Sequence, residues 1–315
     1  MLIIRFCIRF IYYGFKNNLT AHKDINLNKK CALLTIEDLS NFESYDDLLI
    51  EPFNLLGWEC IFVPWESKSV DWDDFDAVII RSTWDYQQKE NLFFKTLTKI
   101  SKSKAKLYNP LSVVKWNINK NYLKDLQEKN IAIIPSKFFD IFDYKSIKKC
   151  FLSFETNRLI IKPSVSANAD DTFILEESLI DENKVLLSNT FKNKEYLVQP
   201  FLENIEIEGE YSLIFFGDFL SHVLLKTPKT GDFRVQEEHG GILKSINLPE
   251  NSLVDFGLKV IKNLPMPCLY SRIDVVRNND QFLLMEVELI EPSLYFNMNS
   301  ESAIKFAKVF DKWHC

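Results

Sequence analysis

The chain has 315 residues, which is enough for two or three domains with a sizeable hydrophobic core. Its 46% hydrophobic and 26% charged residues are typical of a soluble globular protein. The net charge of −6 argues against a nucleic-acid partner, because a general nucleic-acid binder usually carries a basic field. No apolar run is long enough to cross a bilayer, so we expect no stable membrane span.

The six cysteines are scattered without a CxxC pair, and the four histidines are equally dispersed. This pattern is typical of buried thiols in a reducing compartment and predicts a cytoplasmic protein. Neither a zinc site nor a Cys–His nucleophile is expected.

Residues 1–30 stand apart from the rest of the chain. Their apolar start is interrupted by Arg5 and Arg9, and no small-residue cleavage site follows, so they make a poor secretory signal. We predict an extension ahead of the first domain. A segment lying on a membrane surface and an extra strand are the alternatives.

A strand–helix–strand rhythm begins at Cys31. Strands are predicted over 31–36, 58–64 and 75–80, with a helix over 46–56 that ends at Gly57. This rhythm is typical of a small parallel-sheet domain. Residues 81–86 (RSTWDY) follow the third strand directly, and ligands of open parallel sheets gather at the carboxyl ends of strands. The segment is therefore a substrate-site candidate, or else it caps the domain.

Two lysines stand where an anion would explain them. Lys120 lies in the first turn of a predicted helix, where a cation is unfavourable for the helix dipole unless an anion is near. A strand over 131–134, stopped by Pro135, is expected to follow. Lys162 ends the apolar strand 158–163 and must snorkel or meet a negative charge. The small-residue loop 164–172 after it is suited to covering phosphates with its amides, or is an ordinary turn.

The C-terminal part is predicted to be antiparallel sheet with helices. A strand over 196–202 contains Gln199-Pro200, where backbone groups can read a flat ring. An antiparallel hairpin over 211–226 turns at Gly217, and Lys226 and Arg234 lead into a polar loop. The fold class is therefore α/β, with an α+β C-terminal part.

Residues 270–294 hold the densest group of charges. Two apolar runs flank the polar tetrapeptide 277–280, which predicts a β-hairpin. Because strand side chains alternate between faces, one face should carry Arg272, Asp274, Leu284, Glu286 and Glu288. The other face should carry Ile273, Val275, Leu283, Met285, Val287 and Leu289. Carboxylates gathered without enough cations repel one another, which a hard divalent cation would relieve. A solvated strand face is the alternative.

The order of these parts resembles the ATP-grasp superfamily. The chain carries IIRSTWDY, KPSVSANADDT, GEYSL, GDFRVQ and ELIEPSL, and it is similar to D-alanine–D-alanine ligase, glutathione synthetase and the cyclo-ligase that closes D-cycloserine. The resemblance covers about residues 31–313. It implies an ATP-grasp fold with a Rossmann-like pre-ATP-grasp domain at 31–114. The ATP-grasp domain would follow at 115–315, with a lid subdomain at about 131–198.

The resemblance also implies the site. Contacts to ATP would come from Lys120 and Lys162 at the phosphates, Glu210 at the ribose, the lid loop from Ser164 to Asp171, and an adenine hinge of Gln199, Pro200, Phe201 and Leu202. Mg²⁺, with Mn²⁺ as the alternative, would be held by Asp274, Glu286 and Glu288. Charge on the transferring phosphoryl group would be stabilised by Arg272 with Lys226 or Arg234.

The implied activity is ATP-dependent ligation through an acyl phosphate. A small amino-acid-like or peptide-like carboxylate would be joined to an amine or a related nucleophile. A small-molecule kinase and a non-catalytic nucleotide-binding protein are the alternatives. A homo-oligomer is possible, since relatives are often dimers or tetramers, but the sequence does not decide the oligomeric state. The chain departs from the family pattern in two places. Glu288 stands where many relatives have Asn, and Gln199-Pro200 where relatives often have Glu-Lys.

Overall fold

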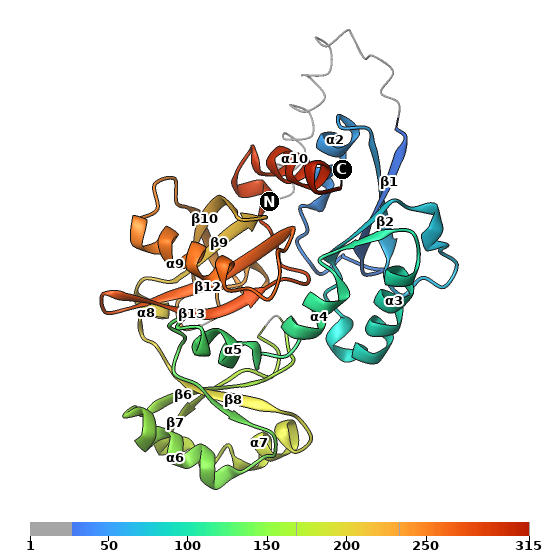
Figure 1. Ribbon diagram of the computed structural model, residues 1–315. Coiled ribbons are helices and arrows are strands. Elements are labelled where there is room, and N and C mark those ends of the chain that lie inside the picture. The colour runs from blue at the N-terminus through green and yellow to red at the C-terminus, as the bar shows by residue number, and fades with distance from the viewer. Residues whose placement is uncertain (1–26, 168, 233, 315) are drawn as a thin grey trace.

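The structure, a computed structural model, describes residues 27–167, 169–232 and 234–314. The first 26 residues of the predicted extension lie outside this range. Strand β1 begins at Lys29, inside the stretch expected to precede the first domain. The described chain forms three sheets, each with its own helices (Figure 1). No helix in the described residues is long and apolar enough to cross a membrane.

The N-terminal sheet is parallel and has the strand order β2-β1-β3-β4. In its central strands β1 and β3, residues 31–34 and 77–80 are buried and apolar, as a parallel sheet covered on both faces requires. The three predicted strands are confirmed, while the short β4 was missed. The predicted helix over 46–56 is a 3-10 turn, Asp46–Leu49, running into a short α-helix. The elements are β1 (Lys29–Thr35), α2 (Ile50–Asn54), β2 (Trp58–Pro64), β3 (Ala77–Ser82), α3 (Glu90–Lys102), β4 (Lys106–Tyr108) and α4 (Leu111–Asn117).

A second sheet, antiparallel and ordered β5-β8-β6-β7, forms the lobe at the bottom of Figure 1. We call it the lid sheet, and its lobe the lid lobe, after the predicted lid subdomain. The strand predicted over 131–134 is wrong. That segment forms no strand and makes a single parallel bridge, from Ile133 to Leu284 in the edge strand of the central sheet. The elements are α5 (Tyr122–Glu128), β5 (Lys137–Phe139), α6 (Tyr144–Phe154), β6 (Arg158–Pro163), β7 (Phe173–Glu176), α7 (Lys184–Phe191) and β8 (Tyr196–Pro200).

The third sheet, ordered β11-β10-β9-β12-β13, lies at the centre of the molecule (Figure 1). One of its faces packs against α5 and α9 in a continuous apolar core. The other face is apolar at one end, where it meets α10 and the N-terminal sheet, and charged at the opposite end. The elements are α8 (Asn204–Ile207), β9 (Glu210–Phe216), β10 (Phe219–Thr227), β11 (Ile242–Ser245), α9 (Asn251–Lys262), β12 (Tyr270–Asn278), β13 (Gln281–Glu288) and α10 (Ser302–His314).

The predicted hairpin forms, but a β-bulge changes part of its facing. Asp274 pairs with Glu286, whereas the next residue, Val275, pairs with Leu284, so Met285 is the extra residue. A bulge shifts the alternation by one residue. Leu284 therefore points into the apolar core and Met285 lines the charged side, the reverse of the simple alternation. The bulge leaves Glu286 on the same side as Asp274.

The N-terminal and central sheets are joined by a buried polar junction. The Asn109 amide donates to the carbonyls of Tyr270 (3.0 Å) and Leu289 (2.8 Å), and its oxygen accepts from the Leu269 amide (2.7 Å). The Tyr270 hydroxyl lies 2.7 Å from the Ile80 carbonyl oxygen. These contacts satisfy backbone groups that water cannot reach, so they fix the N-terminal sheet against β12 and the end of β13.

Replacing Asn109 by Ala should destabilise the fold by roughly 3 kcal/mol, because three buried backbone groups lose their partner. Urea unfolding followed by circular dichroism measures the change. Asn91→Ala, on the exposed surface of α3, is the matched control and should change stability by less than about 0.5 kcal/mol. Equal stability of the two variants would show that the junction does not depend on Asn109.

Candidate functional site

One large cavity lies where the three sheets meet. One half is lined by the lid sheet and the central sheet, including Ile134, Ile160, Lys162, Gln199–Leu202 and Met285. The other half adds residues of the N-terminal domain and the loop after β13, including Trp84, Tyr86, Glu291, Ser293 and Tyr295. The predicted phosphate lysines and the three predicted metal carboxylates line the same cavity.

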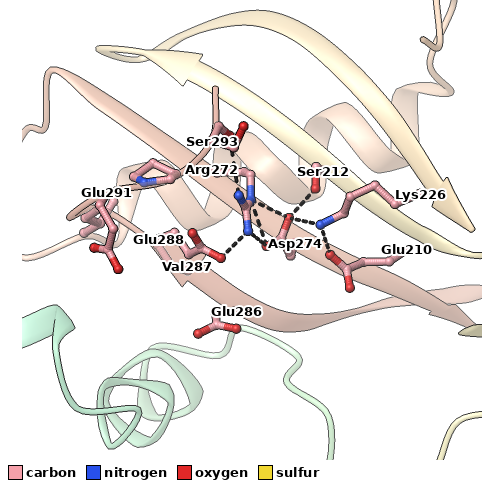
Figure 2. Close-up of polar contacts among 12 residues, drawn as sticks. Glu210, Ser212, Lys226, Arg272, Asp274, Glu286, Val287, Glu288, Glu291 and Ser293 are labelled. Atoms are coloured by element: carbon pink, nitrogen blue, oxygen red, sulfur yellow. Dashed lines mark hydrogen bonds and ion pairs between the residues drawn. The ribbon is translucent and has the colours of Figure 1, made fainter. Parts of the chain in front are cut away.

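Asp274 is the centre of a buried network of charges (Figure 2). The Arg272 guanidinium donates to both of its carboxylate oxygens at 3.0–3.1 Å, and Lys226 Nζ lies 3.5 Å away. The Ser212 hydroxyl also donates to it. Burial alone raises the pKa of Asp274, but attraction to Arg272 and Lys226 outweighs burial and lowers the pKa to about 2.

The network extends to both sides of Asp274 (Figure 2). Lys226 forms an ion pair with Glu210, and Arg272 forms one with Glu288. Burial lowers the pKa of Lys226, yet the attraction of Asp274 and Glu210 is larger and raises it. Arg272 and Lys226 therefore stay charged with their guanidinium and ammonium groups held in place by carboxylates.

The two predicted phosphate lysines lie side by side but are held differently. Lys120 Nζ contacts the Ser166 carbonyl oxygen at 2.8 Å and a Glu286 carboxylate oxygen at 3.1 Å. Lys162 is equally buried, but within the described residues no carboxylate lies within 4.0 Å of it. Burial, joined by the charge of Lys120, lowers the pKa of Lys162, and attraction by Glu286 from beyond ion-pair distance offsets only part of this effect. A buried lysine without a carboxylate partner calls for an anionic ligand.

The remaining predicted residues lie in and around the same cavity. The Gln199 side chain is buried and donates to the Ser136 hydroxyl at 2.8 Å, while Pro200, Phe201 and Leu202 line the wall beside it. Ser164 is buried, and its carbonyl accepts from the Lys120 amide at 2.7 Å. Arg234 is not part of the network. Its guanidinium binds Asp232, two residues away, at the cavity rim.

Sequence reasoning missed three residues of the site. Met285 faces the cavity only because of the bulge. Tyr295 lines the cavity with a left-handed backbone conformation (φ 48°), and its ring centroid is 5.8 Å from the Arg272 guanidinium. Glu291 is buried beside Tyr86. The fragment ELIEPSL contained Glu291 as its second acid, but this residue could be recognised as part of the site only once Tyr86 was placed next to it.

The three predicted metal carboxylates have the donor atoms that a divalent cation prefers, but they do not form an isolated cluster. Asp274, Glu286 and Glu288 offer hard oxygen donors on one face. Among the described residues, however, no three such groups stand together as metal ligands, and each of these carboxylates already has a lysine or arginine partner. The expected shortage of cations was wrong, since Lys120, Lys226 and Arg272 supply them. These three carboxylates and their cationic partners already neutralise one another. A polyphosphate that bound here would add negative charge, which a divalent cation would offset.

The chain is similar to several proteins of known structure. The N-terminal domain of D-cycloserine synthetase DcsG, as a family model, matches residues 31–109. The cycloserine biosynthesis protein DcsG of Streptomyces lavendulae is 26% identical over 277 residues, covering 82% of this chain and 90% of that protein. The crystal structure of D-cycloserine synthetase DcsG has a TM-score of 0.80 at 23% identity, covering 91% of this chain and 100% of that chain.

A RimK domain ATP-grasp protein from Sphaerobacter thermophilus DSM 20745 has a TM-score of 0.68 at 14% identity, covering 90% of this chain and 98% of that chain. The chain is thus similar to ATP-grasp ligases. The ATP-grasp fold expected from its motifs is confirmed. In this fold the lid sheet and the central sheet enclose the half of the cavity that holds Lys120 and Lys162.

Glu291 makes the stability of this protein depend on pH. Burial, and then repulsion by Glu288, raise the pKa of Glu291 from 4.5 to about 8. Between these values the folded protein keeps a proton that the unfolded chain has released, so stability falls as pH rises through this window. In Glu291→Gln the fall should shrink, and above about pH 8 the variant should exceed the wild type by at least about 1.4 kcal/mol, the equivalent of one pKa unit.

Urea unfolding at several pH values measures this difference. At pH values below 4.5 both proteins carry a neutral group at position 291, so their stabilities should agree. Glu128→Gln on the exposed end of α5 serves as the control and should follow the wild type throughout. If the unfolding free energies of Glu291→Gln and the wild type changed with pH in parallel, Glu291 would not be the group that causes the pH dependence.

Proposed function

We propose that the protein joins a small amino-acid-like carboxylate to a nitrogen nucleophile through an acyl phosphate made from ATP. The observation that carries this proposal is the buried Lys162 without a carboxylate partner, next to Lys120 in a cavity that continues to the N-terminal domain. Such a cavity can hold a nucleotide at one end and an acceptor at the other. The similarity to DcsG supports a small substrate.

The proposed nucleotide position follows from the lining of the first half. An adenine ring would lie between apolar side chains of the lid and central sheets, among them Ile134, Ile160 and Met285, against the hinge Gln199–Leu202. The phosphates would then reach Lys120 and Lys162. The loop from Ser164 would cover them and exclude water from the reactive intermediate. Glu210, which forms an ion pair with Lys226, would contact the ribose.

Asp274, Glu286 and Glu288 are the proposed ligands of Mg²⁺, which would neutralise phosphate charge during transfer. Glu288 keeps an oxygen donor where many relatives have Asn and adds a charge. Arg272 binds Glu288 and Asp274 at once, so it holds both carboxylates on the cavity side. Its position and that of Lys226 suit them to stabilise negative charge on the transferring phosphoryl group.

Two steps account for the chemistry. In the first, a substrate carboxylate oxygen attacks the γ-phosphorus, and the bond between that phosphorus and the ADP oxygen breaks. In the second, the nitrogen attacks the acyl carbon, and the carbon–oxygen bond to phosphate breaks. No protein nucleophile is needed, because phosphoryl transfer depends on positioning and charge neutralisation. A kinase would instead release a stable phosphorylated product.

The direct test is ADP release by the purified protein with Mg·ATP across amino acids and small peptides, with mass spectrometry of the products. Amide formation coupled to ADP and phosphate release supports the proposal. A stable phosphorylated product would favour the kinase, and no turnover with any carboxylate would contradict both activities.

Lys162→Ala should lower ATP turnover by at least about 100-fold, because a preorganised charge at the phosphates is lost. Lys149→Ala, on the exposed face of α6 in the same lid lobe, should retain wild-type turnover. Circular dichroism and thermal unfolding verify that both variants fold. Wild-type turnover by Lys162→Ala would remove Lys162 from the site.

A further inference from the structure

A second unmatched charge lies at the other end of the cavity. The carboxylates of Glu210, Asp274, Glu286 and Glu288 each have a lysine or arginine partner. Glu291 is as buried as Arg272, yet in the described part of the chain no lysine or arginine lies within 4.0 Å of its carboxylate. Figure 2 shows it beyond Glu288, at the end of the row away from Lys226 and Glu210.

Hydrogen bonds from other parts of the fold hold the backbone around Glu291, but they do not involve its carboxylate. The Trp84 indole donates to the Glu291 carbonyl oxygen at 2.9 Å, and the Arg81 guanidinium donates to the Pro292 carbonyl oxygen at 3.0 Å. The Tyr270 hydroxyl lies 2.8 Å from the carbonyl oxygen of Ile290. Three consecutive carbonyls are thus fixed by side chains from outside the loop, and a glutamine or an apolar side chain at 291 would serve the fold as well.

The surroundings of the Glu291 carboxyl suit a cation. The Trp84 and Tyr86 rings line this half of the cavity, and the Tyr86 hydroxyl is close enough to the carboxyl to lower its pKa. Aromatic faces beside a carboxylate attract an ammonium group. The charged groups that face it are Glu288 from β13 and, on the phosphate side, Lys120. An unpaired buried carboxyl is costly unless a proton or a cationic ligand joins it.

We propose that Glu291 is the acceptor-site residue that receives the protonated nitrogen of the nucleophile and takes its proton before the bond forms. This inference rests on the proposed function and names its acceptor as an alkylammonium or ammonium compound. Burial and repulsion by Glu288 raise the pKa of Glu291 to about 8, which suits a group that exchanges a proton with an amine.

The step balances in protons and electron pairs. The cationic nitrogen binds the ionised form of Glu291, because an opposite charge beside the carboxyl favours that form over the protonated one of the free protein. The Glu291 carboxylate then takes one proton from the ammonium nitrogen, which frees the nitrogen lone pair. That pair forms the bond to the acyl carbon, and the carbon–oxygen bond to phosphate breaks with its electrons on the phosphate. The second nitrogen proton leaves with the phosphate, and Glu291 returns its proton to solvent.

Two small nucleophiles separate this role from a structural one. Near neutral pH hydroxylamine is largely neutral, whereas ammonium is protonated, and both are small enough to enter whatever the natural acceptor is. The carboxylate found by ADP release is incubated with Mg·ATP and either nucleophile, and the hydroxamate and the primary amide are quantified. Glu291→Gln should keep hydroxamate formation within about twofold and lose amide formation by about 100-fold. Raising the pH should restore the amide, because free ammonia needs no base.

Tyr86→Phe is the second variant, and it should lower amide formation less than Glu291→Gln does, because it keeps the aromatic ring and the carboxyl. Glu128→Gln should form both products at wild-type rates. An equal loss of both products in Glu291→Gln and Tyr86→Phe would falsify the acceptor role and leave a structural one. A wild-type protein that makes hydroxamate but no amide would also overturn it. A wild-type protein that makes neither product contradicts the proposed ligase activity itself.

Discussion

Buried charges that must be matched are the constraint on which the site depends. Asp274 lies in the centre of the molecule, and an isolated carboxylate there would be prohibitively costly. Arg272, Lys226 and Ser212 each bind it, so the side chains of three neighbouring strands are held by one carboxylate. Buried ion pairs contribute little net stability compared with apolar packing, but breaking one is severe. The network therefore fixes geometry more than it stabilises the fold, and that geometry orients the neighbouring acids.

Two exceptions to this matching define the two ends of the cavity. Lys162 is a buried cation without a carboxylate partner, and Glu291 is a buried carboxyl without a cationic one. Each is a group whose ordinary charge state the protein alone does not satisfy. A ligand that is anionic at one end and cationic at the other would complete both, which is the charge pattern of a nucleotide beside an ammonium compound. Unmatched buried groups of this kind are more informative than the matched ones, because folding alone gives no reason to keep them.

The sequence was sufficient for the parts of the site that depend on local pattern. Lys162 could be identified because it ends an apolar strand, and the facing of Arg272 and Asp274 followed from strand alternation. The Met285 bulge could not be predicted, since a one-residue offset depends on the partner strand. Arg234 was predicted as a possible partner of Arg272 in stabilising phosphoryl charge. In the structure its guanidinium forms an ion pair with Asp232, two residues earlier. Glu291 was missed because its neighbours Trp84 and Tyr86 lie some two hundred residues away in sequence.

The two halves of the cavity depend on different parts of the molecule. The nucleotide half is built from the lid sheet and the central sheet, whereas the acceptor half needs the segment from Arg81 to Tyr86 on the N-terminal sheet. That segment is positioned through Asn109 and Tyr270, which tie the N-terminal sheet to β12. A shift at this junction moves Tyr86 relative to Glu291 and leaves Lys120 and Lys162 in place. Changes at the junction should therefore affect the choice and use of the nucleophile more than the binding of ATP.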